Sequence, residues 1–219
     1  MNHRQKDGLG VGMEKKKSKT REYIESLVIA AIIAFFVRGF IVQAFKIPSS
    51  SMEPTLLIGD HLLVNRLSYV MKVPFTDTVI FSLGSPKKED VIVFRYPMDK
   101  NKDFIKRVIA TEGDKLEIVN KVIYVNDKRI DDKWGHYTDN DIIPVYLSPK
   151  DNLGPIVVPK DSYFVMGDNR DRSLDSRFWG FVKKEDLVGK AFILYFSWNN
   201  KSNSVLDYIR WNRIGRLIH

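Results

Sequence analysis

Three consecutive serines stand between two prolines in the stretch Lys46-Ile-Pro-Ser-Ser-Ser-Met-Glu-Pro-Thr-Leu56. A proline fixes its own φ and biases the preceding residue toward extended backbone, so Pro48 and Pro54 should hold the serines in a stiff, non-helical loop. Such a loop can present one hydroxyl in a fixed direction, as a serine nucleophile requires. A Ser/Pro-rich linker has the same composition, so these residues alone leave both interpretations open. The choice depends on whether the chain also offers an activating base.

The candidate base is Lys106, in the stretch Phe104-Ile-Lys-Arg-Val-Ile109. In a strand, alternation places Phe104, Lys106 and Val108 on one face, which gives the lysine apolar neighbours. A lysine accepts a proton only when neutral, and burial lowers its pKa from about 10.4. A pKa of about 8 would cost roughly 3 kcal/mol of folding free energy, which a fold can tolerate. The commoner arrangement, a lysine stem on the sheet with its amine in water, fits the same residues.

A third polar stretch follows a predicted strand: Gly167-Asp-Asn-Arg-Asp-Arg-Ser-Leu-Asp-Ser-Arg-Phe-Trp-Gly180. Dense polarity inside a β domain must be paired internally or solvated. The stretch is therefore either an exposed loop rich in ion pairs or the source of a hydroxyl that orients Lys106.

Composition argues against several other chemistries. The chain has no cysteine, which excludes disulfides, thiolate zinc sites and cysteine nucleophiles. Its four histidines are scattered and form no His-Glu-x-x-His pattern, so no metal is expected. Much of the formal charge of +8 lies in two basic clusters, and neither belongs to a recognisable nucleic-acid-binding module. These clusters are Lys15, Lys16, Lys17, Lys19 and Arg21, and Arg210, Arg213 and Arg216.

The serine loop directly follows an apolar segment. Residues 23–44 are mostly apolar, and about 20 residues suffice to span a bilayer. The basic cluster before this segment predicts a cytoplasmic N-terminus. We therefore expect a cytoplasmic basic tail at 1–22, a transmembrane anchor at 23–44 and an extracytoplasmic domain at 45–219. Residues 45–51 can extend at most ~23 Å, which predicts a nucleophile near the membrane surface.

The same apolar segment also resembles a cleavable secretory signal. Val42-Gln-Ala44 would be its small-residue cleavage site, and cleavage would release a soluble protein. Arg38 interrupts the region where the apolar core of a signal should meet its cleavage site, which favours the anchor.

After Leu56, short runs of β-branched and aromatic residues alternate with Gly, Pro, Asn and Asp, as is typical of an antiparallel β domain. Residues Asn120 and Lys121 should form the turn of a tight hairpin. Polar, Pro- and Gly-containing residues at about 131–155 predict a small inserted cap. The expected strands are 61–65, 78–81, 90–95, 104–111, 115–119, 122–125, 162–166 and 190–198.

Several blocks occur in one order along the chain: Pro48-Ser-Ser-Ser-Met-Glu-Pro-Thr-Leu56, Gly59-Asp60, Leu63-Val-Asn-Arg-Leu-Ser68, Asp90-Val-Ile-Val-Phe-Arg-Tyr-Pro97, Phe104-Ile-Lys-Arg107 and the segment from Gly167 to Arg177. Together they resemble type I signal peptidase, the bacterial leader peptidase family. The resemblance implies a mainly β fold, in which a single transmembrane helix precedes an antiparallel β-sheet catalytic domain with a small cap. It also implies a serine endopeptidase that removes signal peptides from exported preproteins, after small residues of the Ala-x-Ala type and without a cofactor.

By this resemblance Ser51 is the nucleophile and Lys106 is the general base of a Ser/Lys dyad. Ser49 resembles a side-chain donor to the oxyanion, beside the backbone N–H of Ser51, where fixed donors stabilise developing charge. Ser173 matches a serine that hydrogen-bonds the lysine amine. The resemblance further implies a substrate contact at Met52 and supporting roles for Asp168, Arg107, Asp175 and Arg177.

The implied enzyme is a monomer of the bacterial cytoplasmic membrane, with its catalytic domain on the outer side. Its partners are signal peptides and the lipid bilayer, with no nucleic acid. Two alternatives stay open: a self-cleaving repressor-type Ser/Lys protease, which would carry a DNA-binding domain in place of the anchor, and a membrane-tethered β module that binds secreted proteins. The segment from Arg210 to Arg216 either lies on anionic lipid or closes the β domain.

Overall fold

A computed structural model describes residues 19–72, 79–199 and 208–219 of the chain. The chain divides into two compact units after Val37. In the first unit, the helix α1 (Lys19–Phe36) has no buried residue. Together with the short π-helix η1 (Val37–Ile41), it forms the one segment of the described residues that is long and apolar enough to cross a membrane. Most of the predicted basic tail, including Lys15 to Lys17, lies outside the described residues.

The bounds of the apolar segment differ from those expected. Helix α1 begins at Lys19 rather than at residue 23, and the helical part ends at Ile41. Val42 to Ala44, expected as the end of the anchor, belong to strand β1 (Val42–Lys46) because they pair with β2 (Asp60–Asn65). Lys46 lies opposite His61, so the predicted stiff tether is the end of a strand followed by a loop.

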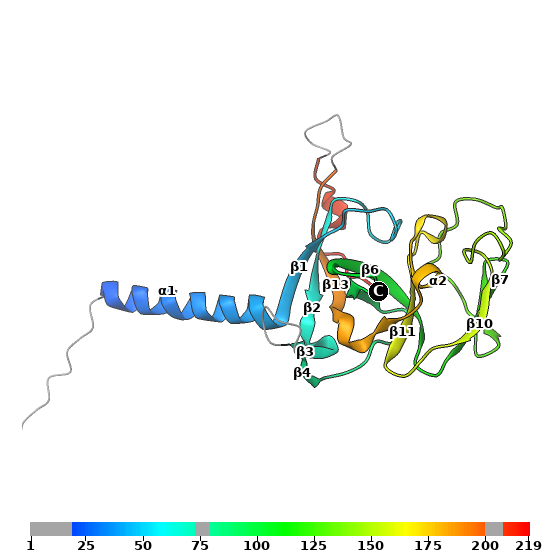
Figure 1. Cartoon of the computed structure of the whole chain (residues 1–219). Helices are drawn as coiled ribbons and strands as arrows, with labels where there is room; N and C mark the ends of the chain where they lie inside the picture. Colours follow the sequence, from blue (N-terminus) through cyan, green and yellow to red (C-terminus); the bar gives the residue numbers. More distant parts are fainter. Residues whose placement is uncertain (1–18, 73–78, 200–207) are drawn as a thin grey trace, which may run out of the picture. The chain divides into compact units, whose positions relative to one another are not determined.

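The second unit is built on a seven-stranded antiparallel sheet (Figure 1). Its strand order is β1-β2-β13-β5-β6-β11-β12. The remaining strands of this sheet are β13 (Leu187–Ser197), β5 (Val91–Tyr96), β6 (Asp99–Thr111), β11 (Ser162–Met166) and β12 (Val182–Lys183). Strands β2 and β5 do not pair with each other, since β13 lies between them.

A four-stranded sheet lies beyond β11, away from β1 (Figure 1). Its order is β10-β7-β8-β9, with β10 (Leu153–Val157), β7 (Lys115–Val119), β8 (Val122–Val125) and β9 (Lys128–Arg129). Strands β3 (Val70–Lys72) and β4 (Val79–Ser82) form a separate pair. The short helices are η2 (Arg66–Ser68), η3 (Arg170–Arg172), α2 (Ser176–Trp179), η4 (Lys184–Asp186) and η6 (Trp211–Arg213).

The predicted fold class, an apolar N-terminal helix followed by an antiparallel β domain, is confirmed. Strands β7, β8 and β11 have the expected bounds. The turn between β7 and β8 is the expected hairpin, because Asn120 and Lys121 both have positive φ, as a two-residue hairpin turn requires. Strand β6 begins at Asp99, earlier than expected. The predicted strand at 78–81 corresponds to β4, and its residue 78 lies outside the described residues.

Three buried apolar clusters form the core of the described β unit. One of them holds the serine loop in place, since Ile47, Met52 and Leu56 pack there against Leu62 and Val64 of β2. A second gathers around Ile92, Phe94 and Val108, on β5 and β6. The third joins the two sheets. Its members are Ile109, Ala110, Leu116, Ile118, Ile123, Val125, Val158, Phe164 and Met166.

Candidate active site

The serine loop connects β1 to β2 and is closed at both ends. The N–H of Ile47 donates to the carbonyl of Asp60 (2.8 Å), and the N–H of Gly59 donates to the carbonyl of Ile47 (3.0 Å). The Asp60 carboxylate accepts hydrogen bonds from Arg213 at 2.6 and 3.0 Å. With Met52 buried in the core next to Ser51, the loop has little freedom to move. As a substrate contact, Met52 stays a prediction.

Strand β6 brings Lys106 to Ser51. The Nζ of Lys106 lies 2.7 Å from the Oγ of Ser51 and 3.0 Å from the carbonyl oxygen of Ile105. Lys106 is 3% exposed and Ser51 9% exposed. The ring of Phe104 lies 5.5 Å from Nζ, as the alternation along this strand predicts. A base and a hydroxyl at hydrogen-bond distance, in a buried place, have the geometry of an activated nucleophile.

Burial is the main influence on the charge of Lys106. It lowers the pKa of the amine from 10.5 to about 8, because the ammonium loses its hydration. The negative charges of Asp175 and Asp168 raise the pKa and so oppose this effect, whereas Arg177 lowers it further. About a tenth of the lysine is therefore neutral at pH 7, compared with well under 0.1% in water.

Two further serines, Ser49 and Ser173, are expected to assist this pair. Ser49 is an exposed residue, and its Oγ lies 3.5 Å from the Oγ of Ser51. The Oγ of Ser173 is buried and has no hydrogen-bond partner among the described residues, so the expected bond to Lys106 is not formed in this structure. Ser173 instead packs against Gly167. A Cβ on Gly167 would lie 2.3 Å from both the Ser173 Oγ and the Ser51 carbonyl oxygen.

The four residues expected to support the site form two buried ion pairs. Arg107 binds Asp168 with two hydrogen bonds, of 2.7 and 2.8 Å, and also donates to the backbone oxygens of Glu89 and His219. Arg177 binds Asp175 with two hydrogen bonds of 2.9 Å. Asp175 also accepts the N–H of Gly167 (3.0 Å). Both arginines also donate to backbone carbonyls, and such additional partners help to offset the lost hydration of buried ions.

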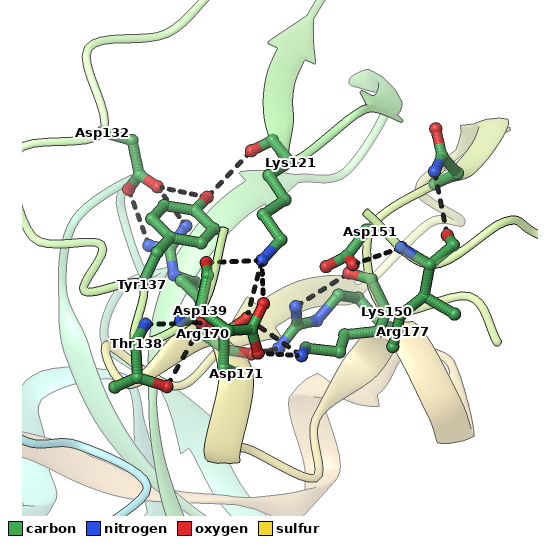
Figure 2. A network of polar contacts seen from close by, with 12 residues as sticks. Lys121, Asp132, Tyr137, Thr138, Asp139, Lys150, Asp151, Arg170, Asp171 and Arg177 are labelled. Carbon is green, nitrogen blue, oxygen red and sulfur yellow. Dashed lines mark hydrogen bonds and ion pairs between the residues drawn. The ribbon is translucent and has the colours of Figure 1, made fainter. Parts of the chain in front are cut away.

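Sequence reasoning missed two groups of residues in and around the 167–180 stretch. Asn169 contacts the backbone of Ser50 and Ser51 directly. Asp171 lies in a cluster of ion pairs with Lys121, Lys150 and Asp139, which Figure 2 shows. Next to it, Arg170 pairs with Asp132. The dense charge of the stretch was a signal for Asn169 and Asp171, but nothing in the sequence indicated which distant lysines would join them.

No cation site accompanies these groups. Among the described residues, no three His, Asp or Glu side chains gather in a way that could hold a metal ion. The acidic side chains near Ser51 are instead bound to arginines. The arrangement offers a serine hydroxyl, a lysine with a lowered pKa and a nearby hydroxyl donor, which together suit acyl transfer.

Comparison with known proteins identifies the family of this chain. Residues 20–198 match the family described as signal peptidase, peptidase S26. Signal peptidase I of Buchnera aphidicola subsp. Schizaphis graminum is 34% identical over 94% of this chain and 84% of its own length. That of Aquifex aeolicus is 36% identical over 81% of this chain and 84% of its own length. A solved structure of signal peptidase I from Enterococcus faecalis is 28% identical, with a TM-score of 0.39, over 48% of this chain and 96% of that chain. The family match and these identities show that the chain belongs to the signal peptidase family of S26 serine peptidases.

Proposed function

We propose that this protein removes signal peptides from exported preproteins, with Ser51 as nucleophile and Lys106 as general base. One observation carries the proposal: in a chain of this family, the Lys106 Nζ lies 2.7 Å from the Ser51 Oγ at a buried position. The lowered pKa of Lys106, about 8, supports the role of a base, because it provides the neutral amine that must accept the proton.

The mechanism is acyl transfer in two steps. Neutral Lys106 accepts the Ser51 proton as the Ser51 oxygen attacks the scissile carbonyl, and the N–H of Ser51 and the hydroxyl of Ser49 donate to the resulting oxyanion. When the tetrahedral intermediate collapses, the Lys106 ammonium gives its proton to the leaving amine, and an ester to Ser51 remains. Lys106 then deprotonates a water molecule that hydrolyses the ester.

The cleavage site of a signal peptide has a characteristic position and composition. A signal peptide presents its cleavage site just beyond an apolar stretch, with small residues near the cut. We infer that the residues at the first and third positions before the cut are small, of the Ala-x-Ala type. The basic residues that precede the apolar segment support an anchor with a cytoplasmic N-terminus and a catalytic unit on the outer side of the membrane. We propose that the enzyme works as a monomer.

Cleavage of a preprotein by the full-length protein in detergent tests the proposal. Wild type should cleave after an Ala-x-Ala site, whereas Ser51→Ala should lose activity by several orders of magnitude. Ser162→Ala is a matched control, because Ser162 is also a buried serine, 6% exposed, on β11 outside the site. Undiminished cleavage by Ser51→Ala would refute the dyad. A protein that binds the preprotein without cutting it would instead be a tethered binding module.

Substrate choice is tested with the same assay. A preprotein with a bulky residue at the first position before the cut should resist cleavage, because a pocket shaped for alanine excludes it. A substitution of similar size several residues further from the cut serves as its control. Equal cleavage of all three substrates would contradict the specificity for small residues.

A further inference from the structure

Asn169 bonds to the backbone on both sides of Ser51. Its own N–H donates to the carbonyl oxygen of Ser51 (3.1 Å), and its side-chain Nδ2 donates to the carbonyl oxygen of Ser50 (3.1 Å). Asn169 is 3% exposed, so water does not compete for these bonds. The two contacts hold two successive peptide units of the serine loop.

These two peptide units decide where the groups of Ser51 point. The carbonyl of Ser50 and the N–H of Ser51 belong to one planar trans peptide unit, in which they point in opposite directions. A hydrogen bond to the Ser50 carbonyl therefore fixes the direction of the Ser51 N–H, the donor proposed for the oxyanion. Fixing the Ser51 carbonyl as well restrains φ and ψ of Ser51 together, and with them the direction of its Cα–Cβ bond.

Among the described residues, the side chain of Asn169 makes one hydrogen bond, which its Nδ2 donates to the carbonyl of Ser50. Its Oδ1 is buried and has no hydrogen-bond partner among the residues that the structure describes. A buried hydrogen-bond acceptor without a partner lowers the stability of a fold by about 1 to 3 kcal/mol, so the unpaired Oδ1 makes asparagine a destabilising choice at this position. The bond from the backbone N–H would remain with another side chain. What asparagine adds is the Nδ2 bond to the carbonyl of Ser50.

The inserted cap holds Asn169 from the opposite side. The N–H of His136 donates to the carbonyl of Asp168 (2.7 Å), and the N–H of Arg170 donates to the carbonyl of His136 (2.9 Å). These bonds form a parallel bridge between His136 and Asn169. The segment 168–170 thus bonds to the cap along one edge and to the serine loop along the other.

The ion pairs around Asp171 strengthen this attachment (Figure 2). Its carboxylate accepts the N–H groups of Thr138 (2.5 Å) and Asp139 (3.0 Å) from the cap. It also lies 3.0 Å from the Nζ of Lys150 and 3.3 Å from that of Lys121, in the β7–β8 turn. The Asp171 side chain is only 2% exposed. Asp171 lies in η3, two residues after Asn169, so these contacts fix the segment that carries Asn169.

We infer that Asn169 is a positioning residue, which directs the N–H and the Oγ of Ser51. The cluster around Asp171 acts through Asn169, so that the cap supports the nucleophile. The inference rests on the proposed role of Ser51. It assigns to the cap an effect on catalysis, although the cap supplies neither member of the dyad.

The first test replaces Asn169 with alanine in the full-length protein. Outright loss of an oxyanion donor costs about 100- to 1,000-fold in kcat, and a donor that is present but no longer held should cost less, about 30-fold. We expect this loss in kcat and in the single-turnover rate of acylation, with KM changed less than about twofold. The pH at which the rate is half-maximal should not move, because Lys106 is unchanged.

Asn152→Ala is the matched control. The Nδ2 of Asn152 also donates to a backbone carbonyl at 3.1 Å, that of Ile143, within the cap and away from Ser51. Its kcat should stay within about twofold of wild type, even if its Tm falls as much as that of Asn169→Ala. If kcat falls equally in both variants, or in neither, the positioning role is refuted.

A double-mutant cycle tests the route through Asn169. Asp171→Asn should lower kcat about tenfold in the wild-type protein but less than twofold in the Asn169→Ala background, because the residue through which it acts is then gone. If Asp171→Asn lowers kcat equally in the two backgrounds, Asp171 does not act through Asn169. Ser51→Ala separates the two proposals: if it stays active, the proposed function fails and the inference with it. If it is inactive while Asn169→Ala keeps its kcat, only the inference fails.

Discussion

Replacing Lys106 with methionine should abolish cleavage and yet make the fold more stable at neutral pH. Methionine has a similar length and no charge, so it fills the same buried space without an ammonium to desolvate. The lysine is 3% exposed, and its amine contacts Ser51 and the carbonyl of Ile105. The variant therefore separates the cost of burying the amine from the benefit of its two hydrogen bonds.

The size of the effect follows from the lowered pKa. The unfolded lysine titrates near 10.5 and the folded one at about 8, and this difference corresponds to about 3 kcal/mol at pH 7. The two lost hydrogen bonds offset about 1 kcal/mol each. Lys106→Met should thus be more stable than wild type by about 1 kcal/mol at pH 7. Between pH 8 and 10.5 the folded wild-type protein binds fewer protons than its unfolded state, so its stability increases as the pH rises. Near pH 10.5, Lys106→Met should therefore be less stable than wild type by about 2 kcal/mol.

Urea denaturation of the full-length protein in detergent, at a series of pH values, measures this difference. Lys102→Met is the control, because Lys102 lies on the same strand but its side chain is 67% exposed. Its stability relative to wild type should change little with pH. A difference between Lys106→Met and wild type that stays constant from pH 7 to pH 10.5 would show that Lys106 keeps an ordinary pKa. In a cleavage assay, the rate of the wild-type protein should rise about tenfold per pH unit below pH 8 and level off above it.

Three further predictions concern the surroundings of the dyad and the membrane. Gly167→Ala should lower kcat about 100-fold or more, because its Cβ would lie 2.3 Å from the Ser51 carbonyl oxygen and from the Ser173 Oγ; single-turnover kinetics would measure this, and an unchanged rate would contradict the close packing. Asp171→Asn should lower the free energy of unfolding by about 2 kcal/mol at pH 7. Burial alone would raise the pKa of Asp171, but hydrogen bonds from the backbone N–H of Asp139 and from Lys150 outweigh it and hold the pKa well below 3.8. The loss measured by denaturation should therefore shrink as the pH falls below 3.8, and a loss independent of pH would contradict these hydrogen bonds. Protease added to inside-out vesicles should leave residues from Ile47 onward intact on gels, and their digestion would reverse the orientation.

Ser51 and Lys106 each carry a local signal in the sequence, but only the ordered set of motifs that resembles the signal peptidase family identifies them as a candidate dyad. Pro48 and Pro54 mark a stiff loop around Ser51, and the alternation in β6 gives Lys106 apolar neighbours. The β7–β8 hairpin can also be predicted from a local signal, since Asn120 tolerates the positive φ that its turn requires.

The sequence pattern places most of β10 in the cap, because this strand contains Gly154 and Pro155, which usually interrupt strands. It lies at the edge of its sheet, where a missing N–H is tolerated, and local sequence does not reveal which strand will be an edge. The partners of Asp171 were inaccessible for a related reason. Lys121 and Lys150 come from a turn and a loop far away in the chain, so their pairing depends on how the two sheets pack.

The position of β13 between β2 and β5 should affect when the enzyme can become active during its own synthesis. Ser51 lies between β1 and β2 and Lys106 lies on β6, and β13 is the strand of the described sheet that pairs with both β2 and β5. A nascent chain that ends before Leu187 already contains Ser51 and Lys106 but lacks the strand that pairs with both β2 and β5. We expect such a chain to be inactive, in which case the order of the strands delays proteolysis until the peptidase is almost fully synthesised.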